Sequence, residues 1–170
     1  MHMQTPVMWM ALTAAVGIPL YIWRRRRNVL GGLHAYLAER GFSERNASPV
    51  AALAATNPSD GFHFSAAYSG NVQGVPMTLL MLRRTEAVVV QGMSMPNQTI
   101  YIGAHLSPTA ISAGFLAEWQ SKAQAGRDHV VHVSQPAEGG VLIVWKGAPS
   151  RANVEAHVAA LVGSVRHARG

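Results

Sequence analysis

Eight histidines are the residues of this sequence best suited to ligate a metal or transfer a proton. They are scattered along the chain, at His2, His34, His63, His105, His129, His132, His157 and His167. The closest pair, His129 and His132, falls in a predicted strand, where residues three apart point to opposite faces of the sheet. We expect His157 and His167 at solvated or flanking positions of the last predicted helix. The pattern therefore predicts no metal site and no cofactor.

The carboxylates give no clear catalytic pair either, because most of the eight fall at predicted turns, caps or exposed helix positions. General acid–base catalysis needs two groups with separated pKa values, close together in a cleft. An enzyme would therefore require His63 or His105 to lie beside a carboxylate. The chain contains no HExxH, GxSxG, Walker or GxGxxG motif. It also has no cysteine, so we predict that the protein is not an enzyme.

The basic residues argue against nucleic acid as a partner. Four of the 14 lysines and arginines form one block, Arg24, Arg25, Arg26 and Arg27. Outside that block the basic residues exceed the eight acidic ones by only two. A nucleic-acid-binding domain normally spreads its positive charge over a face or along a helix. The sequence therefore predicts no nucleic-acid partner.

An uncharged segment precedes the arginine block and predicts a membrane anchor. Residues 6–23 contain no charge, and as a helix they would span roughly 27 Å, close to the ~30 Å hydrocarbon core of a bilayer. Trp9, Tyr21 and Trp23 lie toward its two ends, where aromatic rings favour the water interfaces. By the positive-inside rule, the arginines place the C-terminal domain in the cytoplasm and the N-terminus outside. The expected location is a bacterial inner membrane.

Two other interpretations of this segment remain open: a buried core helix and an export signal. An export signal normally carries its positive charge before the apolar region, and here the charge follows it. Within the segment, Ala11 and Ala15 form a small-xxx-small pair, and Gly17 and Pro19 favour a kink, so these four residues are candidate contacts with a partner helix. The arginine block is interpreted as a topology signal, with recognition of anionic lipid as the alternative.

The rest of the chain predicts a sheet with helices. Leu33, Tyr36 and Leu37 give an amphipathic helix, and Asn46 to Asp60 give a connector. Alternating hydrophobicity and short connections predict an antiparallel sheet. The predicted strands are 62–69, 75–82, 87–93, 99–104, 129–134 and 141–146, and the later helices are 109–124 and one capped by Ser150. Three regions follow: an anchor over 1–27, a helix and connector over 28–60, and an α+β domain over 61–170.

Three finer expectations concern the strands. Phe62, Phe64, Ala66 and Tyr68 are predicted to share one face of the first strand. The polar run from Arg83 to Glu86 is predicted to be a hairpin tip. The methionines of this region are interpreted as core residues, with an adaptable binding surface as the alternative; they are Met77, Met81, Met93 and Met95.

The predicted fold class is α+β: a single N-terminal transmembrane helix, then an antiparallel-sheet sandwich in the order helix, four strands, helix, two strands, helix. The chain carries no motif for a reaction. We therefore expect a non-catalytic, single-pass accessory subunit or assembly factor of a larger bacterial membrane-protein complex, with respiratory or photosynthetic complexes as plausible hosts. Its expected partners are other membrane-protein subunits and the lipid bilayer. The alternative is a membrane-tethered cytoplasmic module that binds a small molecule or a peptide.

Overall fold

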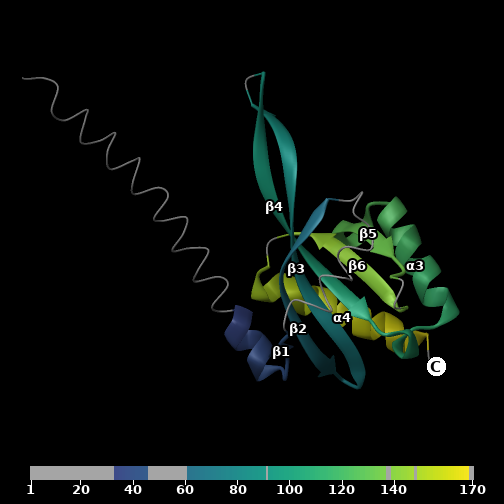
Figure 1. Ribbon diagram of the computed structural model, residues 1–170. Coiled ribbons are helices and arrows are strands. Elements are labelled where there is room, and N and C mark those ends of the chain that lie inside the picture. Colours follow the sequence, from purple (N-terminus) through teal and green to yellow (C-terminus); the bar gives the residue numbers. More distant parts are fainter. Residues whose placement is uncertain (1–32, 46–60, 91, 137–138, 148, 169–170) are drawn as a thin grey trace, which may run out of the picture.

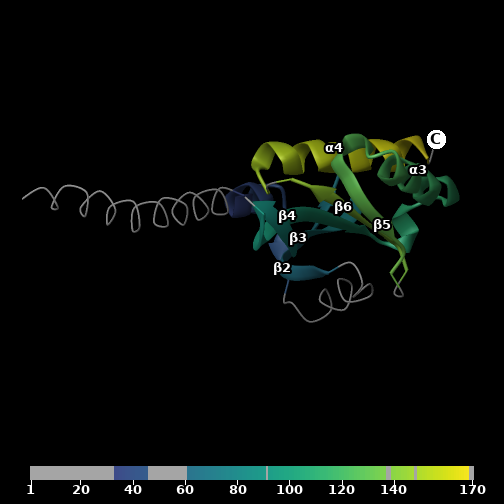
Figure 2. The same cartoon turned by 90° about the horizontal axis from the view of Figure 1, so that it is seen from above.

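The described part of the chain forms one six-stranded antiparallel sheet, with three helices on one of its faces (Figure 1, Figure 2). The computed structural model describes residues 33–45, 61–90, 92–136, 139–147 and 149–168. The strand order is β1-β2-β3-β4-β6-β5. In chain order the elements are a helix over 33–39, β1 (Ser43–Glu44), β2 (Phe62–Val72), β3 (Val75–Val90), β4 (Met93–Leu106), a 3-10 turn (Pro108–Ala110), α3 (Ala113–Gln124), a 3-10 turn (Arg127–His129), β5 (Val130–Ser134), β6 (Val141–Lys146) and α4 (Arg151–His167).

The main core lies between the sheet and the three helices. Phe115 and Trp119 of α3, Leu161 of α4 and Leu37 of the first helix are all fully buried there. The strands contribute every second residue to this core, because successive side chains of a strand point to opposite faces. On β3, for example, these residues are Val75, Met77, Leu79 and Met81.

A second buried cluster lies on the opposite face of the sheet. Leu80 and Leu82 of β3 and Tyr101 of β4 are its centre, and Phe62 and Phe64 of β2 pack against it. The centre of β3 is therefore buried on both faces, which agrees with its continuous apolar sequence. The burial of Met77 and Met81 also confirms their interpretation as core residues.

The predicted fold class is wrong in its first element, the transmembrane helix. Among the described residues, no helix is long and apolar enough to cross a membrane. The helix over 33–39 is short and packs its apolar side against the sheet domain. Residues 6–23, on which the prediction rested, lie outside the described residues.

The predicted division into strands is also wrong, although six strands are both predicted and found in the described residues. The segments expected as four strands before α3 form three, because β3 and β4 are single strands of 16 and 14 residues. Arg83 to Glu86 lie within β3 and pair with Ile100 to Asn97 of β4, so they are not a hairpin tip. These residues are polar because the hairpin leaves the body of the protein at this point and both of its faces meet solvent. Polarity here indicates exposure, and the turn comes only after Val90.

The first predicted strand exists, but its four aromatic and apolar residues do not share a face. Phe64 pairs with Leu82 and Ala66 with Met81, so Ser65 is an extra residue in β2 and forms a β-bulge. The bulge reverses the alternation. Phe62 and Phe64 therefore pack in the second cluster, while Ala66 and Tyr68 belong to the main core.

The later elements follow the predictions closely. The Ser150 side chain accepts a hydrogen bond from the backbone N–H of Asn153 at 3.3 Å and caps α4, as expected. Val154, Leu161, Val162 and Val165 of α4 are buried against the sheet. The helix expected over 109–124 is divided into a 3-10 turn and α3, with Ile111 and Ser112 between them.

Candidate functional site

The far ends of β3 and β4 form a two-stranded arm that projects from the body of the protein (Figure 1). β2 pairs with β3 only as far as Arg84, and β6 pairs with β4 only as far as Tyr101. Beyond these points, residues 85–90 pair only with residues 93–98, and we call these two segments the arm. At about 3.3 Å per residue, six residue pairs extend roughly 20 Å.

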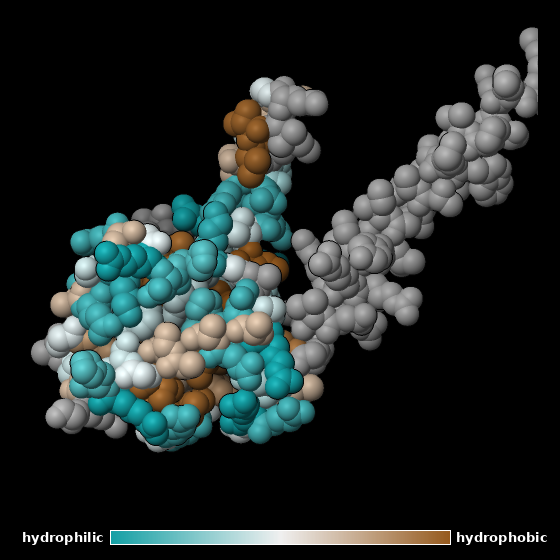
Figure 3. Space-filling view, turned by 180° about the vertical axis from the view of Figure 1, so that it is seen from behind, coloured by the Kyte–Doolittle hydropathy of each residue, from teal (hydrophilic) through white to brown (hydrophobic). Residues whose placement is uncertain are grey.

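The end of the arm is apolar and exposed. The exposed fractions are 70% for Val89, 62% for Met93 and 38% for Val88. In the space-filling view, hydrophobic residues gather at the end of this projection, above a polar zone (Figure 3). No residue from Ala87 to Ile100 carries a charge. Exposed hydrophobic strands with free edges promote association with other chains, so a stable arm of this kind needs a partner or a protective device.

A buried tyrosine and a glutamate hold the base of the arm. The Tyr101 hydroxyl donates a hydrogen bond to the Glu86 carboxylate, and the Thr99 hydroxyl donates a second one at 3.2 Å. The hydrogen bond from Tyr101 lowers the pKa of Glu86, and Thr99, Lys146 and Arg84 act in the same direction. Burial, together with the hydrogen bond to Glu86, raises the pKa of Tyr101 to about 12. Near neutral pH, Tyr101 is therefore a protonated donor and Glu86 an ionised acceptor.

This arrangement positions the arm and is poorly suited to catalysis. A tyrosine with its pKa raised to about 12 is a weak acid, and a carboxylate that accepts two hydrogen bonds is a weak base. The Tyr101 ring also packs edge-on against Phe62, with ring centroids 5.1 Å apart. These contacts tie the first residues of the arm to the second buried cluster, and they fix the direction in which the arm leaves the sheet.

An enzyme would require His63 or His105 to lie beside a carboxylate, and among the described residues neither histidine is found beside one. His63 is exposed on β2 and pairs in register with Arg83. His105 lines a cavity of about 400 Å³, but the described residues that line this cavity include no carboxylate. The His105 Nε2 lies 3.1 Å from the backbone oxygen of Gly139, which can only accept, so Nε2 donates.

His157 is half-buried on α4, so of the solvated and flanking positions that we predicted it occupies a flanking one. Its ring stacks on Trp145 at a centroid distance of 4.7 Å and an angle of 13°, and Trp145 in turn meets Trp119 edge-on at 5.8 Å. Burial lowers the pKa of His157, and the nearby His129 lowers it further, while Asp128 opposes both. His157 is therefore a neutral member of an aromatic stack at neutral pH. No group of three or more His, Asp and Glu residues within the described segments could hold a metal ion.

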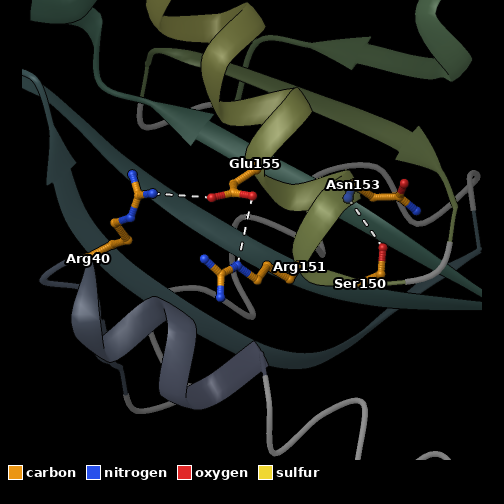
Figure 4. A network of polar contacts seen from close by, with 5 residues as sticks. All are labelled: Arg40, Ser150, Arg151, Asn153 and Glu155. Carbon is orange, nitrogen blue, oxygen red and sulfur yellow. Dashed lines mark hydrogen bonds and ion pairs between the residues drawn. The ribbon is translucent and has the colours of Figure 1, made fainter.

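A polar network joins the first helix to α4 (Figure 4). Glu155 lies between two arginines: its Oε1 is 3.2 Å from Arg40 Nη2, and its Oε2 is 3.9 Å from Arg151 Nε. Both guanidinium groups also lie over the Tyr36 ring, at 5.3 and 4.8 Å from its centroid. All three charged side chains are more than one third exposed, so the network contributes little to stability and mainly orients the helix.

The site residues predicted from the sequence lie outside the described residues. They are Trp9, Tyr21, Trp23, Arg24, Arg25, Arg26 and Arg27 at the expected interfaces, and Ala11, Ala15, Gly17 and Pro19 as expected partner contacts. The alternative interpretation of the methionines, an adaptable binding surface around Met77 to Met95, covers most of the arm, but it did not separate buried Met77 from exposed Met93. A signal was present: the uncharged run over 87–100 begins directly after the charged residues at the arm's base.

Comparison with known proteins adds no family to this geometry. The chain matches no protein family model, no curated protein and no solved structure.

Proposed function

We propose that this protein is a non-catalytic accessory subunit or assembly factor of a larger complex, and that it binds its partner protein through the arm. The observation that carries this proposal is the exposure of Val89 and Met93 at the end of a two-stranded projection. The outer edges of the arm pair with no other described strand, so they offer unpaired N–H and C=O groups to a chain that adds alongside.

The charges around the arm indicate the kind of partner. Arg83, Arg84 and Lys146 lie exposed at its base, against the single carboxylate of Glu86. The end of the arm is uncharged. A protein with an apolar groove and an acidic rim is complementary to both features, since the groove would take the valines and methionine and the rim would face the arginines. A bacterial inner-membrane location for the complex, with membrane-protein subunits and the bilayer as neighbours, stays a prediction.

The proposal is tested by photo-crosslinking in the native cell with the full chain. One variant carries a photoreactive phenylalanine analogue in place of Val89, and a matched control carries it in place of Val131, which is 44% exposed on β5 at the edge of the sheet. We expect a crosslink to one defined protein from position 89 and none from position 131. The same protein should co-purify with the unmodified chain in a fixed ratio.

Two further variants make the test specific. The double substitution Val89→Thr and Met93→Gln removes apolar surface that would contribute roughly 1 to 2 kcal/mol per side chain on burial, and it should weaken binding about 30-fold or more. Replacement of residues 85–98 by Asn-Gly connects Arg84 to its register partner Thr99 through a two-residue turn. This variant lacks the arm, so it should lose binding and keep a folded body. Crosslinking to lipid, to a second copy of the chain, or equally from both positions would refute the proposal.

A further inference from the structure

A second polar site lies at the other end of the sheet, far from the arm. A cavity of about 400 Å³ opens there, of a size that fits a small-molecule ligand. Its lining residues come from β1, β2, β3 and β4 and the segments that follow them, and they include Ser43, Arg45, Ser69, Thr78 and His105. From Thr78 to Thr85, β3 advances about 23 Å, so the cavity and the arm are separate surfaces.

The floor of the cavity is a row of polar side chains that crosses four strands. Ser43 pairs with Ser69, Ser69 with Thr78, and Thr78 with His105. Period-two alternation puts the last three of these on the same face as Leu80 of the second buried cluster, opposite the helices. The same sheet face therefore changes from apolar to polar within one row, because Thr78 is two residues from Leu80.

The polar groups of this row are held in fixed positions. The hydroxyls of Ser69 and Thr78 are hydrogen-bonded at 2.9 Å. His105 Nε2 donates to the Gly139 oxygen at 3.1 Å, and in the tautomer protonated at Nε2 the acceptor nitrogen is Nδ1. Gly140, with φ of +84°, lies so close to this ring that a Cβ there would be 2.8 Å from Nε2. The glycine turn is therefore shaped around His105, beyond its role in the hairpin.

The charge of the cavity is positive. Arg45 is exposed at its edge and forms no ion pair with any described residue, and the described lining contains no carboxylate. Three hydroxyls, one amide and one imidazole complete the polar lining alongside Ser43. An arginine beside several hydroxyls suits an anionic group, and the imidazole acceptor suits a ligand hydroxyl.

We infer that this cavity binds a small hydroxylated anion, of the sugar phosphate or hydroxycarboxylate class. Arg45 binds the anionic group, the Ser69 and Thr78 hydroxyls contact it or the neighbouring oxygens, and His105 accepts from a ligand hydroxyl. The site is independent of the arm and of the partner proposed for it.

The inference is tested by titrating the full chain with glucose 6-phosphate, gluconate, inorganic phosphate and uncharged glucose, followed by two-dimensional NMR. We expect the two hydroxylated anions to bind more tightly than phosphate, and glucose to bind least. The shifted amide signals should lie in the polar row, at Ser69, Thr78 and His105. Weaker binding of both hydroxylated anions than of phosphate, or shifts spread over the surface, would overturn the inference.

Matched variants separate the site from general charge attraction. Arg45→Gln should weaken binding of the preferred anion at least tenfold, and Thr78→Val, which keeps the shape of the side chain, should weaken it severalfold. Arg127→Gln removes an equally charged, exposed arginine near α3 and should leave binding unchanged. Equal losses in Arg45→Gln and Arg127→Gln would show attraction to net charge alone and would refute a specific site. Because Arg45 and Arg127 are both exposed, neither variant depends on refolding of the core.

Discussion

Trp119 and Trp145 are two buried indoles in contact, and replacing each with phenylalanine should cost different amounts of stability. Both rings are at most 1% exposed. Among the described side chains, Trp119 Nε1 is the buried polar atom that has no hydrogen-bond partner. The indole nitrogen of Trp145 is not a buried atom without a partner. The same substitution therefore removes an unfavourable group in one case only.

The expected magnitudes follow from two opposing effects. Tryptophan to phenylalanine removes three buried ring atoms, which costs roughly 2 kcal/mol at about 0.8 kcal/mol per buried methylene-sized group. A buried N–H without a partner costs about 1 to 3 kcal/mol, and Trp119→Phe relieves that cost. We expect Trp119→Phe within about 1 kcal/mol of the parent protein and Trp145→Phe destabilised by about 2 kcal/mol, with part of the stack on His157 also lost.

Urea and thermal unfolding of the full chain measure this difference. About 2 kcal/mol corresponds to roughly 4 to 8 °C in Tm for a protein of this size. Lys122 Nζ lies 4.2 Å from the Trp119 ring centroid. Lys122→Met, combined with Trp119→Phe and with Trp145→Phe, therefore controls for the cation–π contact. Equal destabilisation of the two variants, or a larger loss in Trp119→Phe, would show that the unpartnered N–H of Trp119 does not destabilise the fold.

Three more predictions follow from the backbone and from His157. Gly140→Ala should lower the free energy of unfolding by more than about 3 kcal/mol, because the new Cβ would collide with the Leu106 carbonyl. Gly74 has the same φ of +84° but open space around it, so Gly74→Ala should cost only about 1 to 2 kcal/mol. Chemical unfolding measures both variants. Deletion of the bulge residue Ser65 should preserve two-state unfolding, because the residues on both sides of it keep their faces of the sheet. Deletion of Gly103, which lies in the regular register of β4, should prevent folding. An unfolded Ser65 deletion would contradict the observed register. Burial lowers the pKa of His157, so the unfolded chain binds the proton more readily than the folded one. The free energy of unfolding should therefore fall as the pH drops below about 6.5. Unfolding measured at pH 5 and 7.5 should show this loss in the parent protein, and His157→Gln should abolish it.

Elements whose cause is local could be predicted from the amino-acid sequence. The Ser150 cap of α4 and the apolar stripe that this helix buries lie within one helix, and the predicted cap is confirmed. The same holds for the hairpin of β5 and β6, whose strands are close in sequence. In these cases the hydrophobic period and the cap suffice, because few distant residues influence the outcome.

The points where the long strands leave the core, and where their alternation reverses, depend on pairing between separate strands. Arg83 to Glu86 have the composition of a turn, yet they continue β3, because their backbone pairs with a segment of β4 and their side chains meet solvent on both faces. The bulge at Ser65 leaves no mark in the composition, since it depends on which residues of β3 lie opposite. The polar row has the same origin: Ser43, Ser69, Thr78 and His105 belong to four different strands and become neighbours only through strand register. Register is a property of pairs of strands, and one strand's sequence specifies it only weakly.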